Sequence, residues 1–565
     1  MTAYTVSSGV TSTGLTLSSG DTEAVLSGGI SVNTTILGGT ETVSSGGSDS
    51  GTTISSGLET VLSGGTASDV TILGGTLALD GNASLTNSGG LTNAGTLFLD
   101  SGNGDGGGSL ALGGTLSNSG AVSIGNTSLS VSDTVTATGL ANNGTINILG
   151  NTTGGTSNQA TLDIAAAAPS TLTGSVNLTG DALLEFADGQ ITGIASAARL
   201  ALLGTQAFVA DAGATSSNSA LTGLTSVAGT FELDYGAALS LGGGLTVTGT
   251  LNLDTNGGSD QDSSLGVAGD LVNSGTVNIA DNGGQGHEGG EQVTVAGTLN
   301  NTGTINIWDD TASATVVTAS TLSLAGGAIN LVGDAHGNGS GPAELIATSG
   351  AAPATLSSTL TLFGPSLVEF ASGGITTIAA GGRLVVGNTQ AFVADAGATS
   401  SNSALTGLTS VAGDFELQYG ATLALSGGLT VTGSLNIETD NFTGGGASLS
   451  VAGDLANSGT VHLGNTFNGQ GGGTLTVSGT LTNQSGATLD IYDDIAVPTV
   501  VTAAGLVNSG TINLNGAASG QASLDAATID LTGGVLQGAG TLVGAVGNTG
   551  GTVEAENSGS AATLT

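Results

Sequence analysis

Aliphatic and polar residues alternate along most of this chain in short runs that end at glycines. Val, Ile or Leu stands at every second position of these runs, and a small turn follows, as in Val61–Gly65 and Ile72–Gly75. Such alternation is typical of β-strands that bury one face. Turn glycines at positions 20, 29, 39, 47, 57, 65 and 75 settle to alternating steps of 10 and 8. The pattern predicts strand–turn units with a period of about 18 residues and positive φ at the corner glycines.

A second phrase, Leu-x-Asn-x-Gly, marks longer units from residue 81 onward. Its asparagines that neighbour one another along the chain are roughly two dozen positions apart, which fits one coil of a β-helix per phrase. Stacked asparagines can form a hydrogen-bonded ladder, and asparagine is also a common turn former. Both interpretations stay open from the sequence. The asparagines of the phrase are Asn93, Asn118, Asn142, Asn273, Asn301, Asn457 and Asn508.

The sequence also contains a longer duplication that spans several of these coils. Residues 205–236 recur as residues 389–420, an offset of 184, with differences only at Thr230/Asp414 and Asp234/Gln418. Arg199 and Arg383 occupy equivalent positions. We therefore divide the chain into a short-period solenoid (1–80), longer coils (81–180), two long repeat units (181–364 and 365–548) and the start of a further, truncated unit (549–565).

These repeats predict an all-β fold, a right-handed parallel β-helix (β-solenoid) rod of stacked coils. Glycine accounts for 103 of 565 residues and aromatic residues for 3%. Small aliphatic side chains suit a long thin core better than a large globular one. A disordered chain would be poor in aliphatic residues, and this chain is not.

The stretch Thr60–Gly75 (TVLSGGTASDVTILGG) resembles the short repeats of AIDA-type autotransporter adhesin passengers. The resemblance is close up to about position 80 and looser beyond it. It implies a β-helical bacterial surface protein that acts in adhesion, autoaggregation or biofilm formation, often with glycosylated Ser and Thr. It does not indicate a particular ligand.

Charge narrows the possible partners. The chain has two basic residues and 42 acidic ones, a formal net charge of −40. Binding to nucleic acid or to anionic lipid needs Lys and Arg, so neither is expected. The absence of cysteine fits export, and no apolar run approaches a membrane span, so direct membrane insertion is not expected. The first residues lack the features of a signal peptide, so we expect either a removed signal or a C-terminal export signal.

Acidic turns suggest one site for a cation. Asp254, Asp260 and Asp262 lie in a turn whose equivalent in the second long unit holds Glu438 and Asp440. Flexible carboxylate loops can bind calcium, although this spacing matches neither an EF-hand nor a nonapeptide repeat. Simple solvated turns are the alternative. Calcium is therefore the one cofactor that the sequence leaves possible.

The remaining polar residues that we considered as site candidates are expected to have structural roles. Arg199 and Arg383 are expected to pair with carboxylates such as Glu185 and Glu369 and so to join neighbouring coils. Asn273, Asn301, Asn457 and Asn508 are expected to be structural as well. No catalytic or cofactor-binding residue is predicted, since the three histidines, His287, His336 and His462, form no recognised motif.

We therefore expect a non-enzymatic, extracellular or cell-surface bacterial protein that serves as adhesin, matrix fibre or filament. The near-identity of the two long units favours a repeated surface over one distinctive catalytic cleft. Exposed strand edges at an uncapped end would invite self-association into fibres or sheets. Cell-surface glycans and host or abiotic surfaces are the other expected partners. A β-helical carbohydrate-active enzyme, a surface-layer subunit and a passive scaffold for a further domain are the alternatives.

Overall fold

The computed structural model describes most of the chain. The described residues are 1–100, 102, 106–152, 158–256, 261–280, 289–334, 341–439, 445–465, 472–493, 498–516, 522–557 and 560–561. They form two compact units, Met1–Gly269 and Asp270–Thr565, and each is considered by itself. The boundary between these units lies inside the long repeat 181–364, and the repeat boundaries stay predictions.

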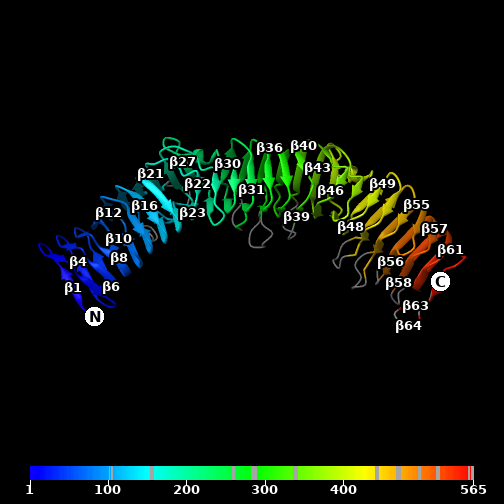
Figure 1. Cartoon of the computed structure of the whole chain (residues 1–565), viewed down its shortest axis with the longest axis horizontal. Helices are drawn as coiled ribbons and strands as arrows, with labels where there is room; N and C mark the ends of the chain where they lie inside the picture. Colours follow the sequence, from blue (N-terminus) through cyan, green and yellow to red (C-terminus); the bar gives the residue numbers. More distant parts are fainter. Residues whose placement is uncertain are drawn as a thin grey trace. The chain divides into compact units, whose positions relative to one another are not determined.

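Both units are parallel β-solenoids, which confirms the predicted fold class (Figure 1). Each coil contributes strands to three walls, and each strand pairs in parallel with its counterpart in the next coil. In unit 1, the first wall contains β1 (Ala3–Val6), β4 (Thr22–Val25), the second halves of β6 (Thr35–Val43) and β8 (Thr53–Val61), β11 (Thr76–Leu79), β14 (Thr96–Leu99), β17 (Ala121–Gly125), β20 (Thr145–Leu149), β23 (Ser175–Thr179), β26 (Arg199–Leu203), β29 (Thr230–Asp234) and β32 (Thr250–Leu253).

The other two walls of unit 1 follow the same order. The second wall contains β2 (Thr11–Thr13), β5 (Ile30–Val32), β7 (Ser48–Ser50), β9 (Thr66–Ser68), β12 (Ser84–Asn87), β15 (Ser109–Leu112), β18 (Asp133–Ala137), β21 (Ala160–Ile164), β24 (Ala182–Phe186) and β27 (Ala207–Asp211), and further along β30 (Ala238–Leu241) pairs with β33 (Ser264–Val267). The third wall contains β3 (Thr16–Ser18), the first halves of β6 and β8, β10 (Thr71–Ile72), β13 (Leu91–Asn93), β16 (Thr115–Asn118), β19 (Gly139–Asn142), β22 (Thr171–Leu172), β25 (Gly193–Ile194), β28 (Ser226–Val227) and β31 (Leu245–Val247).

Unit 2 repeats this plan with longer strands that bend from one wall into the next. Its first wall contains β35 (Thr276–Ile279), β37 (Thr304–Asp309), β39 (Ala328–Gly333), β42 (Thr359–Phe363), β45 (Arg383–Gly387), β48 (Asp414–Gln418), β51 (Ser434–Ile437), β54 (Thr460–Leu463), β56 (Thr488–Asp493), β58 (Thr511–Gly516), β60 (Val535–Ala539) and β62 (Thr552–Glu554).

The remaining strands of unit 2 make up its other walls, and among all described pairings only that of the last two strands is antiparallel. They are β34 (Leu271–Asn273), β36 (Gln292–Asn301), β38 (Thr315–Ser323), β40 (Ala343–Ala352), β41 (Thr355–Leu356), β43 (Ser366–Gly373), β44 (Thr377–Ile378), β46 (Ala391–Asp395), β47 (Ser410–Val411), β49 (Thr422–Leu425), β50 (Leu429–Val431), β52 (Ser448–Val451), β53 (Leu455–Asn457), β55 (Thr474–Asn483), β57 (Val500–Asn508), β59 (Ser523–Leu531), β61 (Thr541–Asn548), β63 (Glu556–Asn557) and β64 (Ser560–Ala561).

Helical structure in the described ranges is confined to two short 3-10 segments, Ser219–Leu221 and Ser403–Leu405. Neither the described part of unit 1 nor that of unit 2 contains a helix with the length and apolar character needed to span a bilayer.

The register gives the coil length directly. Thr22 pairs with Thr40, and Thr40 pairs with Leu58, so the first coils have the period that the glycine spacing predicts. Later coils are longer and less regular, as the pairing of Thr96 with Ala121 shows. The extra residues enter the turns and leave the paired strands in register, as a stacked solenoid allows.

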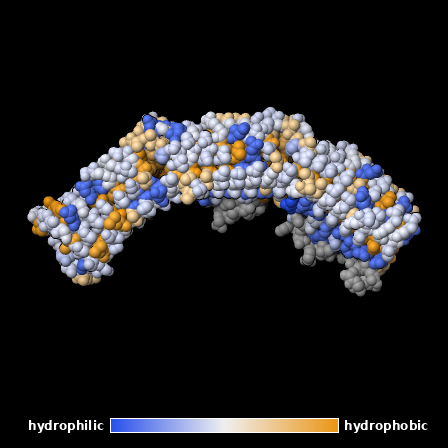
Figure 2. Space-filling model, viewed as in Figure 1, coloured by the Kyte–Doolittle hydropathy of each residue, from blue (hydrophilic) through white to orange (hydrophobic). Residues whose placement is uncertain are grey.

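The core of each unit is a set of aliphatic columns. Alternate residues of each strand point inward, and their counterparts in successive coils stack on one another. In unit 1 such a column on the first wall runs through Ile146, Val176, Leu200, Phe231 and Leu251, all of them buried. On the visible face of the surface, apolar residues form small separate patches among polar ones (Figure 2).

The corner Gly46-Gly47 divides two tasks between its residues. Gly46 has φ of 73°, in the left-handed region, whereas Gly47 does not have positive φ. A Cβ on Gly47 would lie 2.7 Å from the carbonyl oxygen of Val25 in the preceding coil. The first glycine therefore supplies the turn, and the second permits close stacking. The prediction of positive φ is confirmed at positions 20, 57 and 75, and it is wrong by one residue at positions 29, 39, 47 and 65, where the preceding glycine has positive φ.

Candidate functional site

Asparagine side chains form buried ladders along the third wall of unit 1. The Nδ2 of Asn93 donates to the Oδ1 of Asn118, and Asn118 donates likewise to Asn142, both at 2.8 Å. Asn93 also donates to the carbonyl oxygen of Ala121 (2.8 Å). Asn93 and Asn118 thus each donate to both the next asparagine and the backbone, which satisfies amide N–H groups that would otherwise be costly to bury.

Unit 2 contains ladders of the same kind. Asn273 donates to Asn301 (2.8 Å), Asn457 donates to Asn483 (2.9 Å), and Asn483 donates to Asn508 (2.8 Å). The ladder and turn interpretations are both met, because Asn273 also accepts a bond from the N–H of Gly275 (3.1 Å). The phrase search misses Asn483 because the turn after it carries Gln484-Ser485 before the glycine.

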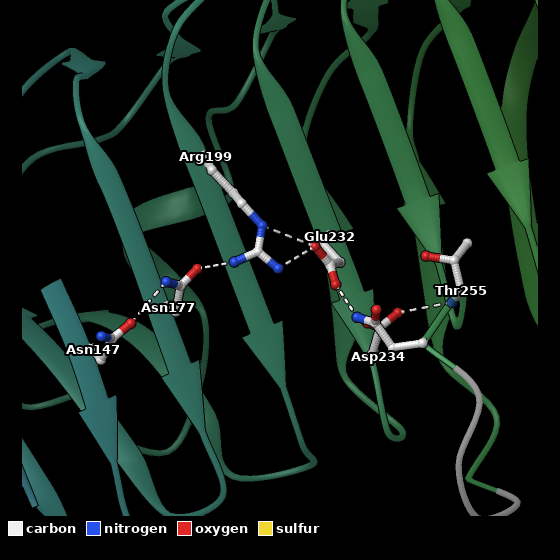
Figure 3. A network of polar contacts seen from close by, with 7 residues as sticks. Asn147, Asn177, Arg199, Glu232, Asp234 and Thr255 are labelled. Carbon is white, nitrogen blue, oxygen red and sulfur yellow. Dashed lines mark hydrogen bonds and ion pairs between the residues drawn. The ribbon is translucent and has the colours of Figure 1, made fainter. Parts of the chain in front are cut away.

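A second polar column runs along the outward face of the first wall of unit 1 (Figure 3). Asn177 donates to Asn147 (2.8 Å) from the neighbouring coil. In register, Asn177 is followed by Ala201 and then by Glu232. Arg199 spans the rung of Ala201, because its guanidinium donates to the Oδ1 of Asn177 on one side and to Glu232 on the other.

The partner of each arginine differs from the sequence prediction. Arg199 donates to Glu232 at 2.5 and 3.1 Å, and Arg383 donates to Glu416 at 2.7 and 3.0 Å and to Asp414 at 3.3 Å. The arginines do join one coil to the next.

The predicted partners lie on another wall. Glu185 belongs to β24 and aligns with Asp163 and Ala210, and Glu369 belongs to β43 and aligns with Ile346 and Ala394. The prediction chose these glutamates because they are close to the arginines along the chain. In a solenoid, the contacts of a side chain depend instead on which residues lie beside it one coil away.

The carboxyl groups beside Arg199 interact with each other as well. Burial raises the pKa of Asp234 to about 8, and the hydrogen bond and repulsion from Glu232 add to the rise. Asn256 donates to both carboxyls, and the N–H of Thr255 donates to Asp234 (3.1 Å). The equivalent residue in unit 2 is Gln418, whose Oε1 accepts the N–H of Thr439 at 2.8 Å.

The predicted calcium residues fall into two groups. Asp260 and Asp440 lie outside the described residues, and Asp262 is exposed. Asp254 and Glu438 are buried loop clamps. The N–H groups of Tyr235 and Ser263 donate to Asp254 (2.6 and 2.7 Å), and those of Gly420 and Ala447 donate to Glu438 (3.3 and 2.8 Å). No cluster of three or more His, Cys, Asp or Glu residues suited to a metal occurs in the described ranges.

The duplicated segments have the same local geometry. In unit 1, Asn218 accepts the N–H of Val209 (2.9 Å) and Ser219 accepts that of Asp211 (2.7 Å). In unit 2, Asn402 and Ser403 accept the N–H groups of Val393 and Asp395 at the same two distances. Residues 205–236 and 389–420 therefore have the same local structure, and their exposed residues are nearly the same as well.

The described histidine, His462, packs against Tyr492 with ring centroids 4.7 Å apart, and burial lowers its pKa. His287 and His336 lie outside the described residues.

Sequence reasoning missed a set of acidic residues inside the first coils, namely Glu23, Glu41, Asp49 and Glu59, all of them buried. Each glutamate stands two residues before an inward valine, as in Glu41-Thr-Val43, so the parity of the alternation places it inside the coil.

Comparison with known proteins adds one structural similarity. No family model matches the chain, and no curated protein matches it. Among solved structures, a fragment of TibA hyper-glycosylated by TibC is similar, with 16% identity and a TM-score of 0.17. The match covers 71% of this chain and 93% of the fragment.

Proposed function

We propose that the chain is a secreted bacterial surface protein with a structural and adhesive role, in cell adhesion, autoaggregation or the biofilm matrix. The observation that carries this proposal is the near-identity of the two duplicated segments, which share their local structure and present the same exposed residues twice. Arg199 with Glu232 and Arg383 with Glu416 form the same bridge in both units, and the turns of Asn218 and Asn402 have the same bonds. A repeated surface suits many weak contacts with a partner better than one reaction at one place.

The internal polar bonds fit the same role. Asparagine ladders and arginine bridges join coil to coil, so that a long exposed solenoid stays in register outside the cell. The proposal assigns no catalytic residue. In it, the acidic side chains solubilise the solenoid, and salt or divalent cations screen their mutual repulsion when copies meet.

Display of the chain on a non-aggregating bacterial host tests the proposal. Cells that carry the chain should settle and form surface films, and the effect should increase with ionic strength as charge repulsion is screened. Cells that display an unrelated acidic protein of similar charge are the control. Equal settling of both kinds of cell at every ionic strength would reject the adhesive role.

An assay of the purified chain distinguishes this proposal from the enzymatic alternative. Purified chain is incubated with acidic and neutral polysaccharides, and new reducing or unsaturated ends are measured. The proposal predicts none above the control protein. Release of oligosaccharides would favour a carbohydrate-active solenoid and overturn the non-enzymatic assignment.

A further inference from the structure

The first coils of unit 1 carry glutamates where later coils carry aliphatic residues. Glu23, Glu41 and Glu59 stack in register at one inward position of three successive coils, and each is at most 1% exposed. Leu77 and Leu97 continue the same column in the next two coils. The acidic column therefore replaces a hydrophobic one within a single segment of the solenoid.

The other two walls of these coils are polar at the same level. On the second wall, Asp49 aligns with Ser31 and is 1% exposed. Near the third wall, Thr52 donates to Asp49 (2.8 Å), and Thr34 donates to Glu23 (3.3 Å). Ser, Thr, Asp and Glu thus form a buried polar layer beside the aliphatic columns of these coils.

No cationic side chain faces these carboxyls. Residues 1–198 contain no Lys, Arg or His, and the one positive group there, the N-terminal amine, lies 3.6 Å from Asp21 on the surface. The titratable side chains that face one another from the packed strands are Glu23, Glu41, Asp49 and Glu59 themselves. Both oxygens of Glu59 and one oxygen of each of the others accept no hydrogen bond within the described residues.

Four ionised carboxylates in this space would be both desolvated and mutually repelling. Burial raises the pKa of Glu41 to about 9, with repulsion from Asp49 and Glu23 adding to it, and burial raises the pKa of Asp49 to about 6. Burial likewise raises the pKa of Glu23 and of Glu59, and for Glu59 repulsion from Asp49 and Glu41 adds to the rise. A bond between two carboxyls requires a proton on one of them.

We propose that Glu23, Glu41, Asp49 and Glu59 form a proton-retaining core that makes strands β4 to β8 a pH-responsive segment. The segment is closed in acid, when the carboxyls are neutral and can donate to one another. It loosens as the pH rises and the core must either bury charge or open to water. The proton is the ligand that we assign to this core, and no group of three carboxylates arranged to hold a metal ion occurs among the described residues.

The sign of the effect follows from linkage. These groups bind protons more tightly in the folded than in the unfolded chain, so stability falls as the pH rises. For Asp49 the loss runs from the ordinary value of 3.8 to about 6, and for Glu41 from 4.5 to about 9. Within that window each retained proton changes the opening equilibrium about tenfold per pH unit.

Hydrogen exchange of the full chain, corrected for the intrinsic rate at each pH, tests the proposal. Protection of Thr22–Val25 and Thr53–Val61 should fall by at least about tenfold per unit between about pH 5 and about pH 8. The double variant Glu41→Gln/Glu59→Gln keeps the shape and adds amide donors, and it should reduce that slope. The control Asp188→Asn, at an exposed carboxyl, should leave it unchanged. Equal slopes in the wild-type chain and the double variant would overturn the proposal.

A measurement on the unaltered chain does not depend on the folding of any variant. The infrared carbonyl band of protonated carboxyl groups should persist in the folded protein at neutral pH and disappear on unfolding. Its absence from the folded protein would contradict the proton-retaining core. Recovery of protection by calcium at alkaline pH, reversed by a chelator, would assign the core to a cation and overturn the proton as its ligand.

Discussion

Arg199 bonds Glu232 in the next coil and thereby spans a rung of its outward column that lacks a polar side chain. The rung carries Ala201, which is buried, and the guanidinium of Arg199 connects Asn177 below it with Glu232 above it. A single arginine thus keeps a polar column continuous through three coils. We infer a structural role for Arg199 from this arrangement.

Replacement of Arg199 by methionine should destabilise the coils around β26 and β29 by about 2 kcal/mol, because Glu232 would lose its charged partner while it remains buried. Hydrogen exchange of these two strands measures the change. The double variant Arg199→Met/Glu232→Gln should recover part of the loss, since no carboxylate is then left unpaired. If Arg199→Met exchanges hydrogen in these strands at the same rate as the wild-type chain, the bridge contributes nothing to stability.

Loss of an asparagine from the middle of the buried ladder should destabilise the chain more than loss of an asparagine from the outward column. Asn118→Ala removes bonds to both Asn93 and Asn142 in a buried position and should cost about 2–3 kcal/mol. Asn177→Ala, at a half-buried site on the outward face, should cost about 1 kcal/mol. Thermal and urea unfolding of the two variants provide the comparison. Equal costs would mean that burial does not strengthen the ladder.

Asp234 should make unit 1 sensitive to pH, and its counterpart suggests the variant. The folded pKa of Asp234 is raised from 3.8 to about 8, so its contribution to stability is full below 3.8 and is lost as the pH rises through about 8. Asp234→Gln, which installs the residue found at position 418, should flatten the pH dependence of exchange in β29 and β32. The reciprocal Gln418→Asp should introduce such a dependence in β48. If neither slope changes, the raised pKa of Asp234 is refuted as a source of pH sensitivity.

Chelation should leave the melting temperature of the full chain unchanged. Asp254 and Glu438 already accept backbone N–H groups that close their turns, so a cation is not needed to neutralise unused oxygens there. Scanning calorimetry with and without calcium and a chelator measures this. A calcium-dependent rise that is lost in Asp262→Asn would instead support the cation site predicted from the acidic turns.

The sequence predicts the solenoid well because its signals are local. Alternation, corner glycines and the spacing of repeats fix strands, turns and coil length, and the register of the first coils follows from glycines alone. The asparagine phrase likewise locates most ladder residues. The phrase does not detect Asn483, because the turn after it is longer and its glycine lies one position later. The strand register nevertheless aligns Asn483 with the other ladder asparagines.

Contacts between coils are harder to predict because they depend on register rather than on sequence distance. Along the chain Arg199 is much nearer to Glu185 than to Glu232, but it bonds Glu232, since Glu185 lies on another wall. The inward glutamates were overlooked for a different reason. The spacing in Glu41-Thr-Val43 indicates that the glutamate points to the same side as the inward valine. Inward positions are expected to be aliphatic, however, and the structure shows a core that departs from that rule.

A register-preserving deletion tests the central claim, that adhesion comes from a repeated solenoid surface. Removal of residues 205–388 joins two equivalent positions of the duplicated segment, so that Arg199 meets Glu416 in place of Glu232 and one full repeat is lost. Settling and film formation are measured on cells that display the shortened and the full chain at equal density. The account predicts a folded shortened chain with reduced but clear adhesion. Complete loss of adhesion from a folded shortened chain would contradict it and point to one unique site within the deleted repeat.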